Sequence, residues 1–425
     1  MIGELLTTGL LFLWKIAYLI IPLIALPIAF HMWLMHKRNE TIAAMDWVTL
    51  EITPPREVFK SPAAMEIVLN AMEDTGGTQT WYKRWVQGRV RPWYSLELVS
   101  VEGTIYFFVR TIRDNKDFVT SQFYSQYPDA QVREVDDYTR YVPQYQRGND
   151  WEMLGFEMQA LNPSVYPIKT YIDYGMDKDI GNDAEMRLDP MSPILEALSI
   201  LGKDEQAWIQ FLIRPAVKKR DPNAPWWAFK KRRWDQEAAD EIAKFQVDSM
   251  KQNMKILKQV DPEKQWATVS LNESQKNVVK ALGRNSSKPP YDFAGRVLYL
   301  AKKDAFKGPR FGMLINMFRA FGSDGLNGFK PTNDTSAKFP WDDPMGTKVE
   351  TWKEEMFYEY VNRMWFHLKR RKFSHRKDPR PQTVLTSEEI ATLWHLPATT
   401  VTSPTVGRVS SNTAQAPGNL PFEQE

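Results

Sequence analysis

The stretch WYSLELVSVEGTIYFFVRTI, Trp93–Ile112, decides the fold class predicted from this sequence. It contains two runs in which apolar and polar residues alternate, Tyr94–Val101 and Thr104–Arg110. The dipeptide Glu102-Gly103 between them fits a tight turn, so the stretch predicts a β-hairpin. A β-sheet is therefore the starting point for interpreting the rest of the chain.

The segments on either side of the hairpin predict an α+β module. A strand is expected at Trp47–Ile52, and Ser61 followed by Pro62 marks the start of a helix. After the hairpin come a helix over about Lys116–Tyr127 and a strand at Gln131–Val135. This order is that of a split-βαβ, ferredoxin-like α/β sandwich, with helices on one face of a sheet.

A second module follows the same order. EQAWIQFLIRP and FAGRVLYLAKK predict buried strands, GPRFGMLINMFRAF a helix and GLNGFKP a closing strand. We therefore expect two ferredoxin-like modules, at residues 40–175 and 190–335, with a helical insertion at 218–287 in the second. An unrelated α+β arrangement is the alternative. An amphipathic helix with a basic segment at 340–378 and an extended, connector-like tail at 379–425 complete the predicted organisation.

The helical insertion carries one apolar stripe at helical spacing, and the stripe predicts a helix of about 25 residues. Its members are Ala239, Ala243, Val247, Met250, Met254 and Leu257. Packing inside the protein and coiled-coil contact with a partner both fit such a stripe. A second helix is expected from near Ser270 to Leu282.

The run GLLFLWKIAYLIIPLIALPIAFHMWLMHKRNE predicts an N-terminal transmembrane helix within residues 1–39. From Ile16 to Met35 no residue carries a fixed charge, and about 20 such residues can span a bilayer core of ~30 Å. A cleaved signal peptide is the alternative. Its apolar core would be about 7–15 residues long and would end at a cleavage site with small residues, which this run lacks.

The flanks of the apolar run predict the location of the remaining chain. Lys37 and Arg38 follow the run, whereas Glu4 precedes it, and positive flanks favour the cytoplasmic side. We therefore expect a single-pass protein of the cytoplasmic (inner) membrane with its C-terminal part in the cytoplasm. The absence of cysteine suits that compartment. The formal net charge of +3 favours no particular partner, so any electrostatic signal must come from local clusters.

The sequence contains no arrangement typical of catalysis. The glycines at 322, 325 and 328 lack the spacing and the following Gly-Lys of a phosphate-binding loop. The five histidines form no metal-binding motif, and the absence of cysteine excludes thiolate chemistry. Three acidic pairs fit turns and helix starts: Asp136-Asp137, Asp342-Asp343 and Glu388-Glu389. Thr386 and Glu389 have the spacing of a capping box. We expect neither an enzyme nor a cofactor.

Two basic clusters are the remaining signals. In the first, KKRDPNAPWWAFKKRRW, cations and aromatic side chains alternate: Lys218, Lys219, Arg220, Trp226, Trp227, Phe229, Lys230, Lys231, Arg232, Arg233 and Trp234. Such a set suits anionic lipid headgroups or single-stranded nucleic acid, on whose bases the rings can stack. A solvated loop is the third interpretation. The second cluster runs from Lys369 to Arg380 and follows a predicted helix, whose C-terminus favours cations.

Several segments resemble the non-motor half of type IV secretion and conjugative-transfer ATPases of the FtsK–HerA superfamily (TraC/TraG-like). In order they are LEITPPREVFKSPAAMEIVL, FVTSQFYSQYPDAQVREVDDYT, AWIQFLIRP and SLNESQKNVVKALGRNSSKPPYDFAGRVLYLA. SEEIATLWHLPATTVTSPTVGRVSSNTAQAPGNLP is similar to the connector that leads into the motor domain of that family. The likeness covers about Val48 to Pro421. The family's motor follows NLP, whereas Phe422–Glu425 follow it here.

The resemblance implies a noncatalytic, membrane-anchored scaffold or docking component of a type IV secretion or conjugation-like translocation machine. The implied partners are the cytoplasmic membrane, a separately encoded P-loop ATPase, and further copies of this chain in a homo-oligomer, for which a hexameric ring is one form. DNA is a further candidate partner. A membrane-tethered nucleic-acid-binding protein is the alternative function.

Overall fold

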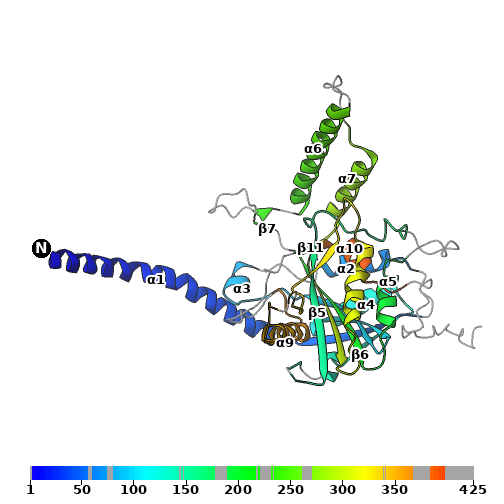
Figure 1. Cartoon of the computed structure of the whole chain (residues 1–425), viewed down its shortest axis with the longest axis horizontal. Helices are drawn as coiled ribbons and strands as arrows, with labels where there is room; N and C mark the ends of the chain where they lie inside the picture. Colours follow the sequence, from blue (N-terminus) through cyan, green and yellow to red (C-terminus); the bar gives the residue numbers. More distant parts are fainter. Residues whose placement is uncertain are drawn as a thin grey trace, which may run out of the picture. The chain divides into compact units, whose positions relative to one another are not determined.

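The computed structural model describes residues 2–55, 60–73, 80–142, 145–146, 148–177, 189–216, 219–220, 231–232, 234–260, 270–337, 339, 341–366 and 383–397. The chain divides into two compact units. Unit 1 consists of Met1–Asp46 and Gly76–Pro92, and unit 2 of Trp47–Thr75 and Trp93–Glu425. Figure 1 colours the chain along its sequence, from blue at the N-terminus.

Unit 1 is built on one long helix, α1 (Ile2–Ala43), and one short helix, α3 (Trp81–Trp85). Leu34 of α1 and Val90 are buried. Gly88 has a φ of +66°, and a Cβ atom on it would lie 2.7 Å from Cβ of Lys37. Glycine is therefore required where the loop after α3 passes α1.

The prediction of a transmembrane helix is wrong. Among the residues that the structure describes, no helix has both the length and the apolar character needed to cross a membrane. α1 is 42 residues long, but its described side chains include two prolines, two histidines, Lys37 and Arg38, which lower the mean hydropathy of that part of the helix.

Unit 2 contains a nine-stranded antiparallel sheet. Its strands are β1 (Trp47–Thr53), β2 (Tyr94–Val101), β3 (Thr104–Ile112), β4 (Gln131–Val135), β5 (Trp151–Ala160), β6 (Glu205–Pro215), β9 (Pro290–Lys302), β10 (Phe329–Thr332) and β11 (Thr383–Thr386). They lie in the order β10-β5-β9-β6-β2-β3-β1-β4, and β11 pairs with β9.

The two halves of the chain contribute to this one sheet, which corrects the prediction of two ferredoxin-like sandwiches. The strand order β4-β1-β3-β2 of the first half is matched by β10-β5-β9-β6 in the second. Between the halves, β2 pairs with β6 from Tyr94 opposite Ile213 to Val101 opposite Gln206. Pairing these strands covers two edges that would otherwise expose backbone groups. The fold class is α+β, with one sheet instead of two sandwiches.

Helices cover both faces of the sheet (Figure 1). The helices that pack on the larger core are α2 (Ala63–Met72), α4 (Lys116–Gln126), α5 (Ser192–Ser199), α8 (Gly308–Asn316) and α10 (Ser387–Leu393). The short helices are η2 (Arg113–Asn115), η3 (Tyr138–Tyr141) and η6 (Met317–Phe321). The opposite face packs against α9 (Thr347–Val361). Along β9, Val297 and Tyr299 join the larger core, whereas Leu298 and Leu300 join the core under α9.

A row of polar side chains crosses the centre of the sheet on the α9 face. Glu97 in β2 lies opposite Gln210 in β6, which in turn lies opposite Arg296 in β9. Arg296 lies opposite Glu157 in β5, and all four residues are buried. Gln210 Nε2 donates to Glu97 Oε1 at 3.1 Å, and Arg296 Nη2 donates to Glu157 Oε1 at 3.4 Å. Most of these buried polar atoms thus have a partner, although Nε of Arg296 has none among the described residues.

Arg363 ties the C-terminal end of α9 to this row. Its Nε and Nη2 donate to the Glu97 carboxylate at 3.0 and 3.1 Å, and its Nη1 donates to Asp137 at 2.6 Å. Burial works to raise the pKa of Glu97, but the charge and hydrogen bonds of Arg363 outweigh burial and lower it. Glu97 therefore stays ionised in the core.

We expect Arg363→Met to destabilise the protein by about 3–5 kcal/mol, because it leaves Glu97 buried without a cation. The half-buried Asp137 keeps its ion pair with Arg110. Arg140 is exposed and serves as the control, since Arg140→Met should change stability by less than about 0.5 kcal/mol. Urea unfolding of the full chain, followed by circular dichroism, measures both. Arg363→Lys, a milder change, covers the case in which Arg363→Met does not fold. A loss below about 1 kcal/mol for Arg363→Met would contradict the assignment.

Candidate functional site

The structure describes part of the predicted basic and aromatic cluster. β7 (Lys219–Arg220) and β8 (Lys231–Arg232) form a two-stranded antiparallel ribbon, with Lys219 opposite Arg232 and Arg220 opposite Lys231. The other members lie outside the described residues: Lys218, Trp226, Trp227, Phe229, Lys230 and Arg233. Contact of this cluster with lipid or nucleic acid stays a prediction.

Trp234, the last member of that cluster, has a packing role. It is the first residue of α6 (Trp234–Val260) and packs on a small core that includes Val165 and Leu282. The second basic cluster, from Lys369 to Arg380, lies outside the described residues.

In the predicted apolar stripe of α6, whose neighbour is α7 (Glu273–Ser286), only Met254 and Leu257 are half-buried. Ala239, Ala243, Val247 and Met250 are exposed, while Ala238, on an adjacent face, is buried. The Asn253 side chain donates to Gln275 Oε1 at 2.8 Å, and Gln275 Nε2 donates back to Asn253 Oδ1 at 3.1 Å. Polar contacts therefore help to select the face that meets α7, which a hydrophobic pattern does not reveal.

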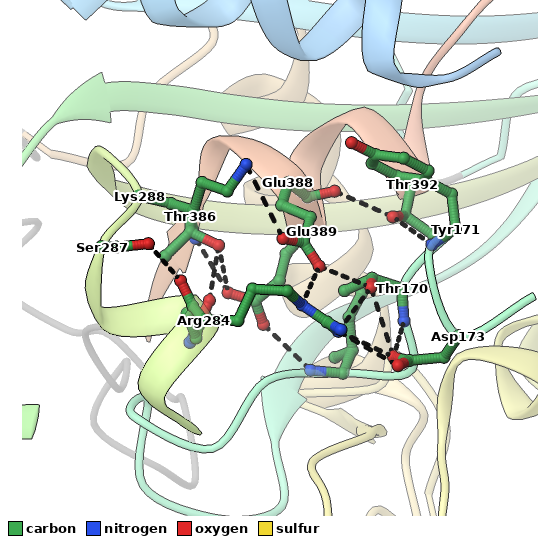
Figure 2. Close-up of polar contacts among 12 residues, drawn as sticks. Thr170, Tyr171, Asp173, Arg284, Ser287, Lys288, Thr386, Glu388, Glu389 and Thr392 are labelled. Atoms are coloured by element: carbon green, nitrogen blue, oxygen red, sulfur yellow. Dashed lines mark hydrogen bonds and ion pairs between the residues drawn. The ribbon is translucent and has the colours of Figure 1, made fainter. Parts of the chain in front are cut away.

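A group of polar side chains in unit 2 surrounds the segment 383–397, and we call it the clamp (Figure 2). The segment begins with β11, whose residues pair with Pro290–Phe293 of β9. It continues into α10, whose seven residues are all buried. The apolar side chains Ile390, Leu393 and Trp394 belong to the main core. The segment is thus both a strand of the sheet and part of the core.

Thr386 and Glu389 form the capping box of α10. Glu389 Oε2 accepts from the backbone N–H of Thr386 at 2.8 Å, and Oε1 accepts from the backbone N–H of Ile168 at 3.0 Å. The loop that holds Ile168 is thereby fixed to α10. Burial raises the pKa of Glu389 to about 7.

The Thr386 hydroxyl has two acceptors within hydrogen-bond distance. This hydroxyl lies 2.6 Å from Asn285 Oδ1 and 3.0 Å from Glu389 Oε2, and both of these atoms are acceptors when Glu389 is ionised. A hydroxyl has one proton to donate. The Thr386 hydroxyl can therefore donate to only one of these two oxygens at a time.

Glu388 connects α10 to two further segments. Its Oε1 accepts from the Thr170 hydroxyl at 2.6 Å and pairs with Arg284 Nε at 3.0 Å. Arg284 Nη2 also donates to Asp173 Oδ1 at 3.1 Å, which bridges α7 to the loop before residue 175 (Figure 2). Burial raises the pKa of Glu388. Thr392 Oγ1 accepts from the backbone N–H of Tyr171 at 3.1 Å.

Glu66 extends the clamp to α2. It pairs through Oε1 with Lys288 Nζ at 2.5 Å, and its Oε2 accepts from the Tyr171 hydroxyl at 2.7 Å. Lys288 Nζ also lies 4.0 Å from Glu388 Oε2. Within the described ranges, no three histidine, aspartate or glutamate side chains are grouped so that they could hold a metal ion. What the clamp does is lock segments together, because each of its carboxylates binds donors from other parts of the chain.

A family model described as a domain of unknown function, DUF8128, matches residues 31–408. The chain belongs to this family. No curated protein matches it. The DUF8128 match includes every strand of the nine-stranded sheet as well as the clamp.

Local sequence patterns indicate the capping box of this DUF8128 protein but not the clamp. Glu388 and Glu389 were interpreted only as a helix start, since two adjacent acids in a first turn usually face water. The apolar residues after them in ATLWHLP were the available sign that the helix is buried. The partners Thr170, Arg284 and Lys288 come from distant segments, and no local pattern indicates them.

The raised pKa of Glu389 predicts a pH dependence of stability. The folded state keeps a proton up to about pH 7, whereas the unfolded carboxyl loses it near its usual pKa of 4.5. The unfolded state therefore binds fewer protons between these values, and the free energy of unfolding falls by roughly 3 kcal/mol as pH rises through that window.

Glu389→Gln cannot ionise, so its stability should lack this fall. Urea unfolding at a series of pH values measures the difference between wild type and variant. Glu196→Gln, at an exposed position, should keep the wild-type slope. If Glu389→Gln and the wild type lose stability in parallel over this window, Glu389 is already ionised in the folded protein.

Proposed function

We propose that this DUF8128 protein is a noncatalytic scaffold of a type IV secretion or conjugation-like translocation machine at the cytoplasmic membrane. In this role it holds a separately encoded P-loop ATPase, and copies of the chain assemble around that motor. The observation that carries the proposal is the clamp on segment 383–397. From Ser387 onward this segment resembles the connector that leads into the motor domain of the FtsK–HerA superfamily.

A connector that meets a working motor bears load, so its attachment must resist withdrawal. α10 has that property, since pulling it out would expose its buried residues and break the bonds of Glu388 and Glu389 to distant segments. A carboxylate left buried without its partner, or a donor left without its acceptor, costs about 1–3 kcal/mol or more for each group. Several such hydrogen bonds and ion pairs would have to break together.

The pairing of β11 with β9 supports the same role. β9 lies between β5 and β6 and is hydrogen-bonded to both over most of its length. A force on residue 397 therefore reaches central strands of the sheet through hydrogen bonds that act in parallel. A surface loop would transmit the same force to a few local contacts only.

The proposal predicts that a P-loop ATPase co-purifies with the tagged full chain from its native cells in mild detergent. Mass spectrometry should identify the ATPase in near-stoichiometric amount, and electron microscopy should show a ring. Arg284→Ala combined with Glu388→Ala should reduce ATPase recovery severalfold, because it loosens α10. Thr392→Val is a milder variant that also removes a clamp contact.

The matched control removes an exposed ion pair on α7, Lys276 with Glu273, which lie 2.7 Å apart. Lys276→Ala with Glu273→Ala should leave ATPase recovery unchanged. Circular dichroism verifies that each variant is folded before its recovery is compared. A preparation that contains only the lone chain would refute the proposal, as would equal ATPase recovery from folded clamp and control variants.

A further inference from the structure

Unit 1 presents an exposed set of aromatic and basic side chains that sequence analysis did not single out. α3 has the sequence WYKRW, and each of its five residues is exposed. Trp81 is 71 % exposed, Tyr82 55 % and Trp85 37 %. Tryptophan and tyrosine have a large apolar body and one polar atom, so three of them on one turn form a surface that suits neither full burial nor full hydration.

α3 is held against α1 by specific contacts, so this surface has a defined shape. The Trp85 ring stacks on Phe30 of α1 with centroids 6.5 Å apart, and Phe30 in turn contacts the Trp33 ring at 5.8 Å. Thr80 caps α3 by accepting from the backbone N–H of Lys83. The close approach of Gly88 to Lys37 fixes the chain that leaves α3.

Positive charge is concentrated at the same place. Residues 34–46 and 80–92 contain six lysines and arginines and two acidic residues, an excess that is larger than the net charge of +3 of the whole chain. Arg38 and Arg84 lie close enough to repel each other. Burial and then this repulsion lower the pKa of Arg38. An anionic ligand would relieve the crowding.

Two exposed apolar side chains of α1, Leu23 and Leu26, lie on the same face of the helix as Phe30. Amphipathic rings between a cationic cluster and an apolar surface match the boundary between lipid headgroups and acyl chains. Single-stranded nucleic acid would use the cations and the rings, but it offers no partner for the neighbouring aliphatic residues.

We propose that α3 and the adjoining turn of α1 form a binding site for an anionic lipid surface. Trp81, Tyr82 and Trp85 lie at the level of the headgroups, and Lys37, Lys83 and Arg84 contact lipid phosphates. The inference rests on the membrane association in the proposed function and assigns it to particular residues. The site differs from the basic cluster at 218–234.

The chain contains no cysteine, so Tyr82→Cys provides a single labelling site for a polarity-sensitive fluorophore. Tyr141→Cys, 76 % exposed and in unit 2, is the control position. The labelled full chain is titrated with phosphatidylcholine vesicles, with and without phosphatidylglycerol. The label at 82 should shift to the blue and brighten with the anionic vesicles, and the label at 141 should not change.

Lys83→Gln with Arg84→Gln should raise the anionic lipid concentration for half-maximal response about 30-fold, because each cation near an anionic surface adds to the affinity. The response to neutral vesicles should change little. Lys276→Gln with Lys280→Gln, an exposed pair on α7, is the charge-matched control and should have no effect.

Three outcomes would overturn the proposal. They are the absence of a shift at position 82, equal shifts of the labels at 82 and 141, and wild-type binding by the double variant. A shift with single-stranded DNA but not with vesicles would assign the surface to nucleic acid instead. No ATPase is present in this assay, so its failure is distinct from failure of the docking proposal.

Discussion

The antiparallel pairing of β2 with β6 is the constraint on which unit 2 depends. It joins two four-stranded sets with the same strand order into one continuous sheet. Both strands thereby become central, and their two faces need cover from different helices. The register also places Glu97 opposite Gln210, which starts the polar row. A register shift of one residue would turn these polar side chains toward the apolar core on the other face.

The two faces of this sheet are completed in different ways. On one face the buried row is closed by Arg363, whose bonds to Glu97 and Asp137 fix the C-terminal end of α9. On the other face the clamp fixes α10 through carboxylates bound to donors from remote segments. Ionic groups of this kind add little net stability over apolar packing, but the loss of one partner is costly. They therefore specify where α9 and α10 attach.

Local sequence patterns predicted many individual elements. The hairpin at Trp93–Ile112, the strand at Gln131–Val135 and the capping box of Thr386 with Glu389 are present in the structure. These elements depend on turn residues, on side-chain alternation and on hydrogen bonds within a few residues. All three can be inferred from a short stretch of sequence.

The features that depend on distant partners were missed. Alternation in YSLELVSV suggests a polar face toward water, yet Ser95 and Glu97 are buried because Tyr138, Gln210 and Arg363 bind Glu97. β5 was not assigned, although it completes the second half of the sheet. The prediction that α1 crosses a membrane is wrong, because no helix in the described part of the chain is long and apolar enough. The aromatic surface of α3 is a tertiary feature as well, since contacts with α1 hold it in place.

Segment 383–397 is an integral part of the sheet and the core, and not a peripheral tail. Native-state hydrogen exchange of the full chain tests this claim most directly, because it measures the opening free energy of each segment. Amides of β11 and α10 should exchange only in the opening that also exposes β6 and β9. Exchange of 383–397 at the rate of the exposed end of α6, while β9 stays protected, would contradict it.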